Sequence, residues 1–265
     1  MSRVELPHSR LRARRKRRRA RLAIVAAGFL FLLMILLVGA SYLPFLQIRE
    51  VEVTGTRTLA TSTVAAYVER AIAGQYLYLF PKRNIFLYPK PEIAAGLLAE
   101  YPELRTADVH AVTFHSIAAD VAEREPKALW CQAESCFLMD QGGVAYAPAG
   151  EAGGFVSYRG LAAGESLPRQ YLEPETFESL FALVDALSQR PEAGPVQSVS
   201  VDAQGDAEAM FESGFVLKFA LHDAGGDVFE RFELALVAEP FVGRSLADFE
   251  YLDLRFGDKL YYRAR

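Results

Sequence analysis

The hydrophobic pattern begins with a long uncharged run near the amino end of the chain. No charged residue occurs from Leu22 to Ile48, and twelve of the nineteen residues from Leu22 to Ala40 are Leu, Ile, Val or Phe. At ~1.5 Å per residue, nineteen helical residues cover about 30 Å, the thickness of a bilayer's hydrocarbon core. These twelve side chains favour insertion by about 4 to 7 kcal/mol. We therefore expect a single transmembrane helix over residues 22–46.

Beyond this run, hydrophobic positions first follow the periods of a small mixed sheet. Residues 51–53 alternate in the manner of a half-buried strand. Thr61 or Ser62 can cap a first helix, and Pro91 suits the first turn of a second helix. Two further alternating runs occupy residues 109–114 and 117–123. The order strand, helix, helix, strand, strand predicts a sheet with two helices on one face, over residues 47–125.

From residue 126 onward the pattern is mostly that of strands. Asp140-Gln-Gly-Gly143 separates two short apolar runs, which is typical of a hairpin turn. Helical spacing starts at Pro174 and again at Asp227, which forms a capping-box pattern with Glu230. Other apolar runs predict strands at 196–201, 207–211, 215–221, 249–256 and 260–262. Residues 126–265 are therefore expected to form a mostly antiparallel β domain with two helices, so the fold class is α+β.

Charge is distributed very unevenly along the chain. Residues 1–21 carry ten Lys or Arg and one Glu, a sum of +9, while the remainder has 19 basic and 32 acidic residues, a sum of −13. Nine of the twelve residues from Arg10 to Arg21 are basic and adjoin the apolar run. The positive-inside rule predicts a cytoplasmic arm over 1–21 and an extracytoplasmic body, a single-pass type II topology. A cleaved signal peptide, a nucleic-acid-binding tract and a buried core helix are alternatives that these features fit less well.

The only cysteines, Cys131 and Cys136, lie on the extracytoplasmic side, where disulfides persist. Strand-like residues flank both of them, a spacing that permits a bridge across a short hairpin. We expect a disulfide that stabilises the fold by about 2 kcal/mol. The alternative is a metal site shared with His110 and His115, but side chains five residues apart point to opposite faces of an extended strand.

Known catalytic signatures are absent from the sequence. It has no Gly-x-Ser-x-Gly, no His-Glu-x-x-His and no phosphate-binding glycine loop. We therefore expect no enzymatic activity and no cofactor. The connector from Gln75 to Tyr88 is unusual because five of its residues are aromatic. Either these side chains pack on their own sheet or they contact a partner or the membrane interface.

Four short strings, in this order behind one span, resemble the FtsQ/DivIB family of bacterial cell-division proteins. They are Val51-Glu-Val-Thr-Gly55, Ala122-Glu-Arg-Glu-Pro-Lys-Ala-Leu-Trp130, Asp140-Gln-Gly-Gly-Val-Ala-Tyr146 and Tyr251-Leu-Asp-Leu-Arg-Phe-Gly257. The resemblance implies a POTRA domain over 47–125 and a partner-binding β domain over 126–265. It also implies a non-enzymatic divisome scaffold at the division site of the cell (inner) membrane.

The same resemblance implies the partners. FtsB/DivIC-like and FtsL-like membrane proteins are expected at the carboxy-terminal β edge, other division proteins at the POTRA domain, lipid at the span, and no nucleic acid. The residues expected to bind a partner are Leu252, Leu254, Arg255, Phe256, Leu260 and Tyr262. For Phe256, the competing interpretation is a core position in the last hairpin. Two other classes stay open: a membrane-anchored cell-wall enzyme and a POTRA-bearing transport or assembly protein.

Overall fold

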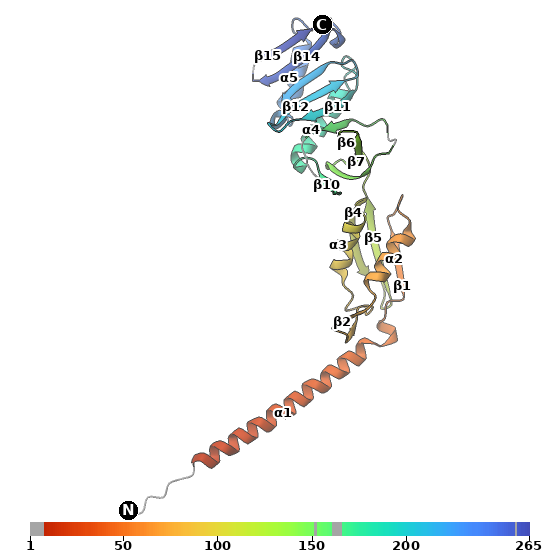
Figure 1. Ribbon diagram of the computed structural model, residues 1–265, viewed down its shortest axis with the longest axis vertical. Helices are drawn as coiled ribbons and strands as arrows, with labels where there is room; N and C mark the ends of the chain where they lie inside the picture. The colour runs from red at the N-terminus through yellow and green to blue at the C-terminus, as the bar shows by residue number, and fades with distance from the viewer. Residues whose placement is uncertain (1–7, 151–152, 161–165, 258) are drawn as a thin grey trace, which may run out of the picture. The chain divides into compact units, whose positions relative to one another are not determined.

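The computed structural model describes residues 8–150, 153–160, 166–257 and 259–265, with side chains from residue 15 onward. The chain has a mixed α+β architecture with five α-helices and a large sheet in the described ranges (Figure 1). It divides into two compact units. Unit 1 comprises residues 1–99 and 106–122, and unit 2 comprises residues 100–105 and 123–265.

The first helix, α1 (His8–Ser41), contains the apolar run. Its segment Arg15–Ser41 is long and apolar enough to cross a membrane. The helix ends at Ser41 rather than at residue 46, and a 3₁₀ turn, η1 (Pro44–Leu46), follows it. The reason is Pro44, which has no backbone N–H to donate and whose ring would clash with the carbonyl of the preceding helical turn.

Unit 1 contains a three-stranded sheet in the order β1-β5-β4, in which β1 pairs parallel with β5. Val64 and Val68 of helix α2 and Ile93 and Leu97 of helix α3 are buried. Helix α2 starts without a side-chain cap, because Ala60 is its N-cap and Thr61 is already helical. The elements that follow η1 are β1 (Glu50–Thr54), α2 (Thr61–Ala71), β2 (Gln75–Tyr76), β3 (Phe80–Pro81), α3 (Lys90–Glu100), β4 (Leu104–Ala111) and β5 (Ser116–Glu123).

Unit 2 is built on one ten-stranded sheet in the order β10-β8-β7-β6-β9-β11-β12-β13-β14-β15. Most neighbours are antiparallel, but β9 pairs parallel with both β6 and β11, and β13 pairs parallel with β14. The strands are β6 (Ala128–Gln132), β7 (Ser135–Met139), β8 (Val144–Pro148), β9 (Ser157–Arg159), β10 (Arg169–Gln170), β11 (Val196–Val201), β12 (Asp206–Phe211), β13 (Val216–Ala220), β14 (Phe249–Phe256) and β15 (Lys259–Ala264).

Two helices, α4 (Pro174–Ser188) and α5 (Asp227–Leu236), supply side chains to the core of this sheet. Alternate residues of the strands join them in a single apolar cluster, so both helices pack on the same face. Large aromatic side chains fill this cluster, among them Phe177, Phe211, Phe215, Phe232 and Phe249. Helix α5 has no side-chain hydrogen bond at its N-cap, Gly226, so the expected capping box does not form.

Candidate partner-binding edge

The last strand, β15, forms one border of the sheet in unit 2. It pairs antiparallel with β14, and the structure describes no strand on its other side. All six residues of β15 are exposed to solvent. A border strand of this kind presents unpaired backbone N–H and C=O groups, which can pair with a strand from another chain. The sheet can therefore accept one more strand at this position.

Apolar side chains lie along this edge. Leu260, Tyr261 and Tyr262 are all exposed, and Tyr262 touches the core through edge-to-face contacts with Phe241 and Phe249, with ring centroids 5.5 and 6.1 Å apart. A partner strand would thus meet rings that are already held in place. Tyr261 was not among the residues expected to bind a partner, although it lies between Leu260 and Tyr262, which were.

Phe256 extends the apolar edge at the hairpin end. Its side chain is 53% exposed and makes an edge-to-face contact with Tyr261, with ring centroids 5.1 Å apart. The interpretation of Phe256 as a core residue is therefore wrong. The pairing of β14 with β15 shifts register between Asp253 and Phe256, so the alternation of buried and exposed residues does not continue regularly to Phe256.

Two of the residues expected to bind a partner are core residues instead. Leu252 and Leu254 are buried, and both belong to the apolar cluster beneath α4 and α5. Their strand, β14, lies between β13 and β15 and is not the edge. Their side chains therefore hold the sheet on its helices and cannot contact a docked chain. The family resemblance assigned partner binding to residues of β14. In the structure, β14 is instead the neighbour on which the edge strand β15 is paired.

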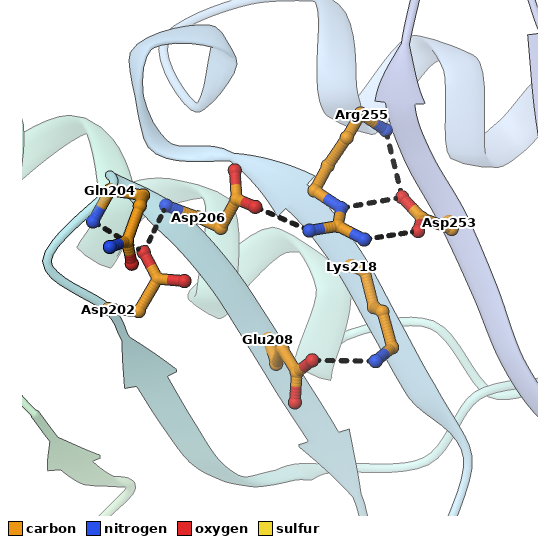
Figure 2. Close-up of polar contacts among 7 residues, drawn as sticks. All are labelled: Asp202, Gln204, Asp206, Glu208, Lys218, Asp253 and Arg255. Carbon is orange, nitrogen blue, oxygen red and sulfur yellow. Dashed lines mark hydrogen bonds and ion pairs between the residues drawn. The ribbon is translucent and has the colours of Figure 1, made fainter.

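Arg255 is bound within its own sheet. Its Nε and Nη2 donate to the carboxylate of the buried Asp253 at 2.9 and 2.7 Å, and its Nη1 also binds Asp206 of β12 (Figure 2). Burial disfavours a charged Asp253, but its hydrogen bonds from Arg255 outweigh burial and lower its pKa. The same hydrogen bonds raise the pKa of Arg255. The guanidinium thus links β12 to β14 behind the edge.

Further hydrogen bonds fix the ends of the last hairpin. Arg265 donates its backbone N–H to Asp248 and its guanidinium to the Gly214 carbonyl, at 2.9 and 2.8 Å. At the turn, Arg231 of α5 donates to the carbonyls of Leu254 and Gly257. These contacts hold the hairpin at both ends, so a partner strand would dock without first having to order it.

At the other side of unit 2, Cys131 and Cys136 are joined by a disulfide with an S–S distance of 2.00 Å. They face each other across the antiparallel pair β6 and β7, which is the hairpin that their spacing predicts. Among the described residues, no group of three His, Cys, Asp or Glu side chains could hold a metal ion. His110 lies instead beside Asp108 and Asp120, at 3.4 and 3.5 Å.

In comparisons with known proteins, no protein-family model and no curated protein matches the chain.

Proposed function

We propose that this protein is a scaffold of the bacterial division machinery, anchored in the membrane by α1 and binding a partner protein through β15. The cytoplasmic arm, extracytoplasmic body and POTRA-like unit 1 belong to the proposal, which follows the resemblance to the FtsQ/DivIB family. The partner is an FtsB/DivIC-like or FtsL-like protein, and docking it beside the septum would help regulate peptidoglycan synthesis.

The observation that carries this proposal is the open, apolar edge of β15. An exposed edge with four apolar side chains is a liability for a protein that works alone, because it invites aggregation. Natural proteins usually protect such edges with charge, proline or a covering segment. Here the two charged residues of the strand, Lys259 and Arg263, lie toward its ends, and Arg263 is paired with Glu250 at 3.0 Å. The centre of the strand, Leu260 to Tyr262, carries no charge. An edge of this kind suits a permanent partner strand.

Site-specific photo-crosslinking in dividing cells tests the edge directly. We expect a photoreactive amino acid at Tyr261 to form an adduct with a small single-pass membrane protein. The same group at Gln189, an exposed position at the end of α4, serves as the control and should form no such adduct. Absence of an adduct from positions 260–262 in cells that express and fold the protein would refute docking at β15.

Binding measurements then separate the contact residues from the supporting ones. Phe256→Ala and Tyr262→Ala should each weaken partner binding by about 1–3 kcal/mol, because exposed aromatic anchors dominate interface energetics. Val237→Ala, which removes an exposed side chain just after α5, is the matched control and should leave affinity unchanged. Pull-down of the partner by folded Phe256→Ala and Tyr262→Ala proteins at the wild-type level would contradict the proposed contacts.

Depletion tests the cellular role. Loss of a division scaffold should give long filaments with blocked septa, whereas loss of a wall hydrolase more often gives chains of cells or altered shape. A reporter enzyme that is active only outside the cytoplasm should be active when it is fused after Arg265. A cytoplasmic carboxyl end would refute the topology on which the scaffold role depends.

A further inference from the structure

A second apolar surface lies on unit 1, at the hairpin of β2 and β3 and the segments beside it. Leu77 and Tyr78 at the hairpin tip are 84% and 94% exposed, and Phe86 and Phe114 are also largely exposed. The rings of Phe86 and Phe114 meet edge to face, with centroids 6.5 Å apart. Phe86 and Phe114 are distant in the sequence and form one apolar surface, and the exposed hairpin tip lies in the same connector as Phe86. We call Leu77, Tyr78, Phe86 and Phe114 the aromatic tip.

The backbone of the hairpin is strained at its most exposed residues. Leu77 and Tyr78 have φ values of 49° and 60°, and the N–H of Leu79 closes the turn on the carbonyl of Tyr76 at 2.9 Å. Two central residues with positive φ are typical of a type I′ turn, where Asn-Gly is strongly preferred. Large side chains in this conformation are costly, and such outliers concentrate at functional positions. At this hairpin the two residues with positive φ, Leu77 and Tyr78, are also its most exposed apolar residues.

Direct hydrogen bonds join this region to the end of the apolar helix. Gln75 Nε2 donates to Tyr42 Oη at 2.9 Å, and the buried Asn84 donates its Nδ2 to the Ser41 carbonyl at 2.8 Å. The Ile85 N–H donates to the Leu46 carbonyl at 2.9 Å. A helix inserted from Leu22 to Ser41 spans ~30 Å, so Ser41 and Tyr42 lie at the boundary of the hydrocarbon core. The segments that carry Tyr78 and Phe86 are thus hydrogen-bonded to the end of α1 through Gln75, Asn84 and Ile85. An inserted helix would hold these segments near the level of the lipid headgroups.

The composition of this region is that of a membrane interface. Residues 42–49 and 75–89 contain Arg49, Lys82 and Arg83 and no acidic residue; Glu50 follows directly. Lys82 also lies over the ring of Tyr76, 5.4 Å from its centroid. Aromatic rings are enriched at the headgroup level, and nearby Lys and Arg attract anionic lipid. The charge therefore complements a phospholipid surface.

We infer that the aromatic tip binds the outer surface of the bilayer in which α1 is anchored, with its rings at the boundary between headgroups and acyl chains. Two attachments to the membrane, the helix and the aromatic tip, would restrict how the three-stranded sheet of unit 1 can tilt relative to the bilayer. The inference rests on the membrane insertion of α1, a part of the proposed function. It does not depend on partner binding at β15.

Nitroxide accessibility measurements on the full chain in vesicles of phosphatidylcholine and phosphatidylglycerol test this contact. The two native cysteines are disulfide-bonded, so an introduced cysteine is the one labelled. The nitroxide is attached to Tyr78→Cys or Phe86→Cys in the aromatic tip. References are Leu30→Cys within the helix and Ala60→Cys, exposed before α2. We expect the ratio of oxygen to nickel-chelate collisions at the tip to exceed the Ala60 ratio severalfold, as in the headgroup region.

Each result has one meaning. If a label in the aromatic tip is as accessible to nickel chelate as the label at position 60, while the label at position 30 is deep in the bilayer, the inference is overturned. The membrane insertion of α1 is then unaffected. A tip shielded from both reagents means that protein covers it, either a partner or a second copy, and also overturns it. If the label at position 30 is exposed to water, α1 is not inserted. The proposed membrane anchoring and this inference are then both wrong.

A second variant separates lipid contact from folding. Leu77→Asn with Tyr78→Gly places the preferred turn pair at the two strained positions and removes both apolar side chains. We expect its melting temperature in detergent to equal or exceed that of the wild type. A label at Phe86 in this background should shift toward the Ala60 ratio. If that label keeps the wild-type ratio in the folded variant, the hairpin does not bind lipid.

Discussion

Arg255→Ala distinguishes a residue that braces the sheet from one that contacts a partner. The Asp253 side chain is 8% exposed and that of Arg255 is 30% exposed, so their pair is mostly shielded from water. Removing one partner of a buried pair costs about 3–5 kcal/mol, whereas an exposed pair contributes 0–1 kcal/mol. For this partly exposed arginine, we expect unit 2 to lose about 2–3 kcal/mol of unfolding free energy at pH 7.

The loss should depend on pH with a definite sign. In the wild type, the pKa of Asp253 lies below its ordinary value of 3.8, because hydrogen bonds from Arg255 outweigh burial. This carboxylate therefore contributes stability above that value, and the contribution disappears as the pH falls through the folded-state pKa. Without the guanidinium, burial alone would raise the pKa of Asp253. The difference between variant and wild type should thus shrink as the pH is lowered below about 4.

Trp130 provides the assay, since it is the single tryptophan, is buried, and lies in unit 2. Guanidinium unfolding of the full chain in detergent, followed by its fluorescence, reports this unit specifically. Arg263→Ala is the matched control: it breaks an exposed arginine pair on the adjacent strand and should cost less than about 1 kcal/mol. Equal losses for the two variants, or a loss for Arg255→Ala that does not change with pH, would refute the bracing role.

Three further outcomes concern the same unit. Replacing Cys131 and Cys136 by serine should lower its unfolding free energy by about 2 kcal/mol, measured by the tryptophan transition, because the bond closes a short loop. Arg124→Ala should lower the unfolding free energy by about 3 kcal/mol in the same assay, since it leaves the buried Asp140 without its 2.6 Å ion pair. A loss below about 1 kcal/mol, as for an exposed pair, would contradict this prediction. Burial, followed by the charge of Asp140, raises the pKa of Tyr146 to about 12. Stability present below pH 10 should therefore decline between pH 10 and 12, and Tyr146→Phe should lessen this decline; ionisation of all tyrosines near pH 10 in the folded protein, followed by ultraviolet absorbance, would refute it.

Local chemistry explains which elements were predictable from the sequence. Alternation predicted the strand around Val51 and Val53, and Asp140 predicted a tight turn, where it accepts N–H groups of Gly142 and Val144 at 2.9 and 3.0 Å. The helix ends were less predictable. A serine or threonine near a helix start is only a candidate cap, and the turn that actually precedes α2 places Ala60 there.

The candidate site was predictable only in part, because a sheet edge is a non-local property. Leu252 and Leu260 are both apolar residues in strand-like runs near the end of the chain. Nothing in their own sequence distinguishes the buried residue from the exposed one. The distinction comes from β13, which pairs with β14 on one side and leaves β15 outermost. The position of β9 between β6 and β11 is equally non-local, since its two neighbours are distant in the sequence.

The sequence by itself determined the apolar helix, the charge gradient, the other helices and the longer strands, and the cysteine spacing that allows a short bridge. These follow from hydrophobic period, charge and chain geometry within a few residues. The tertiary structure alone decided which strand lies at the border, that Arg255 is held by Asp253 and Asp206, and that Phe86 meets Phe114. The physical reason is that burial and strand pairing depend on which distant residues come together, and only the folded chain specifies those neighbours.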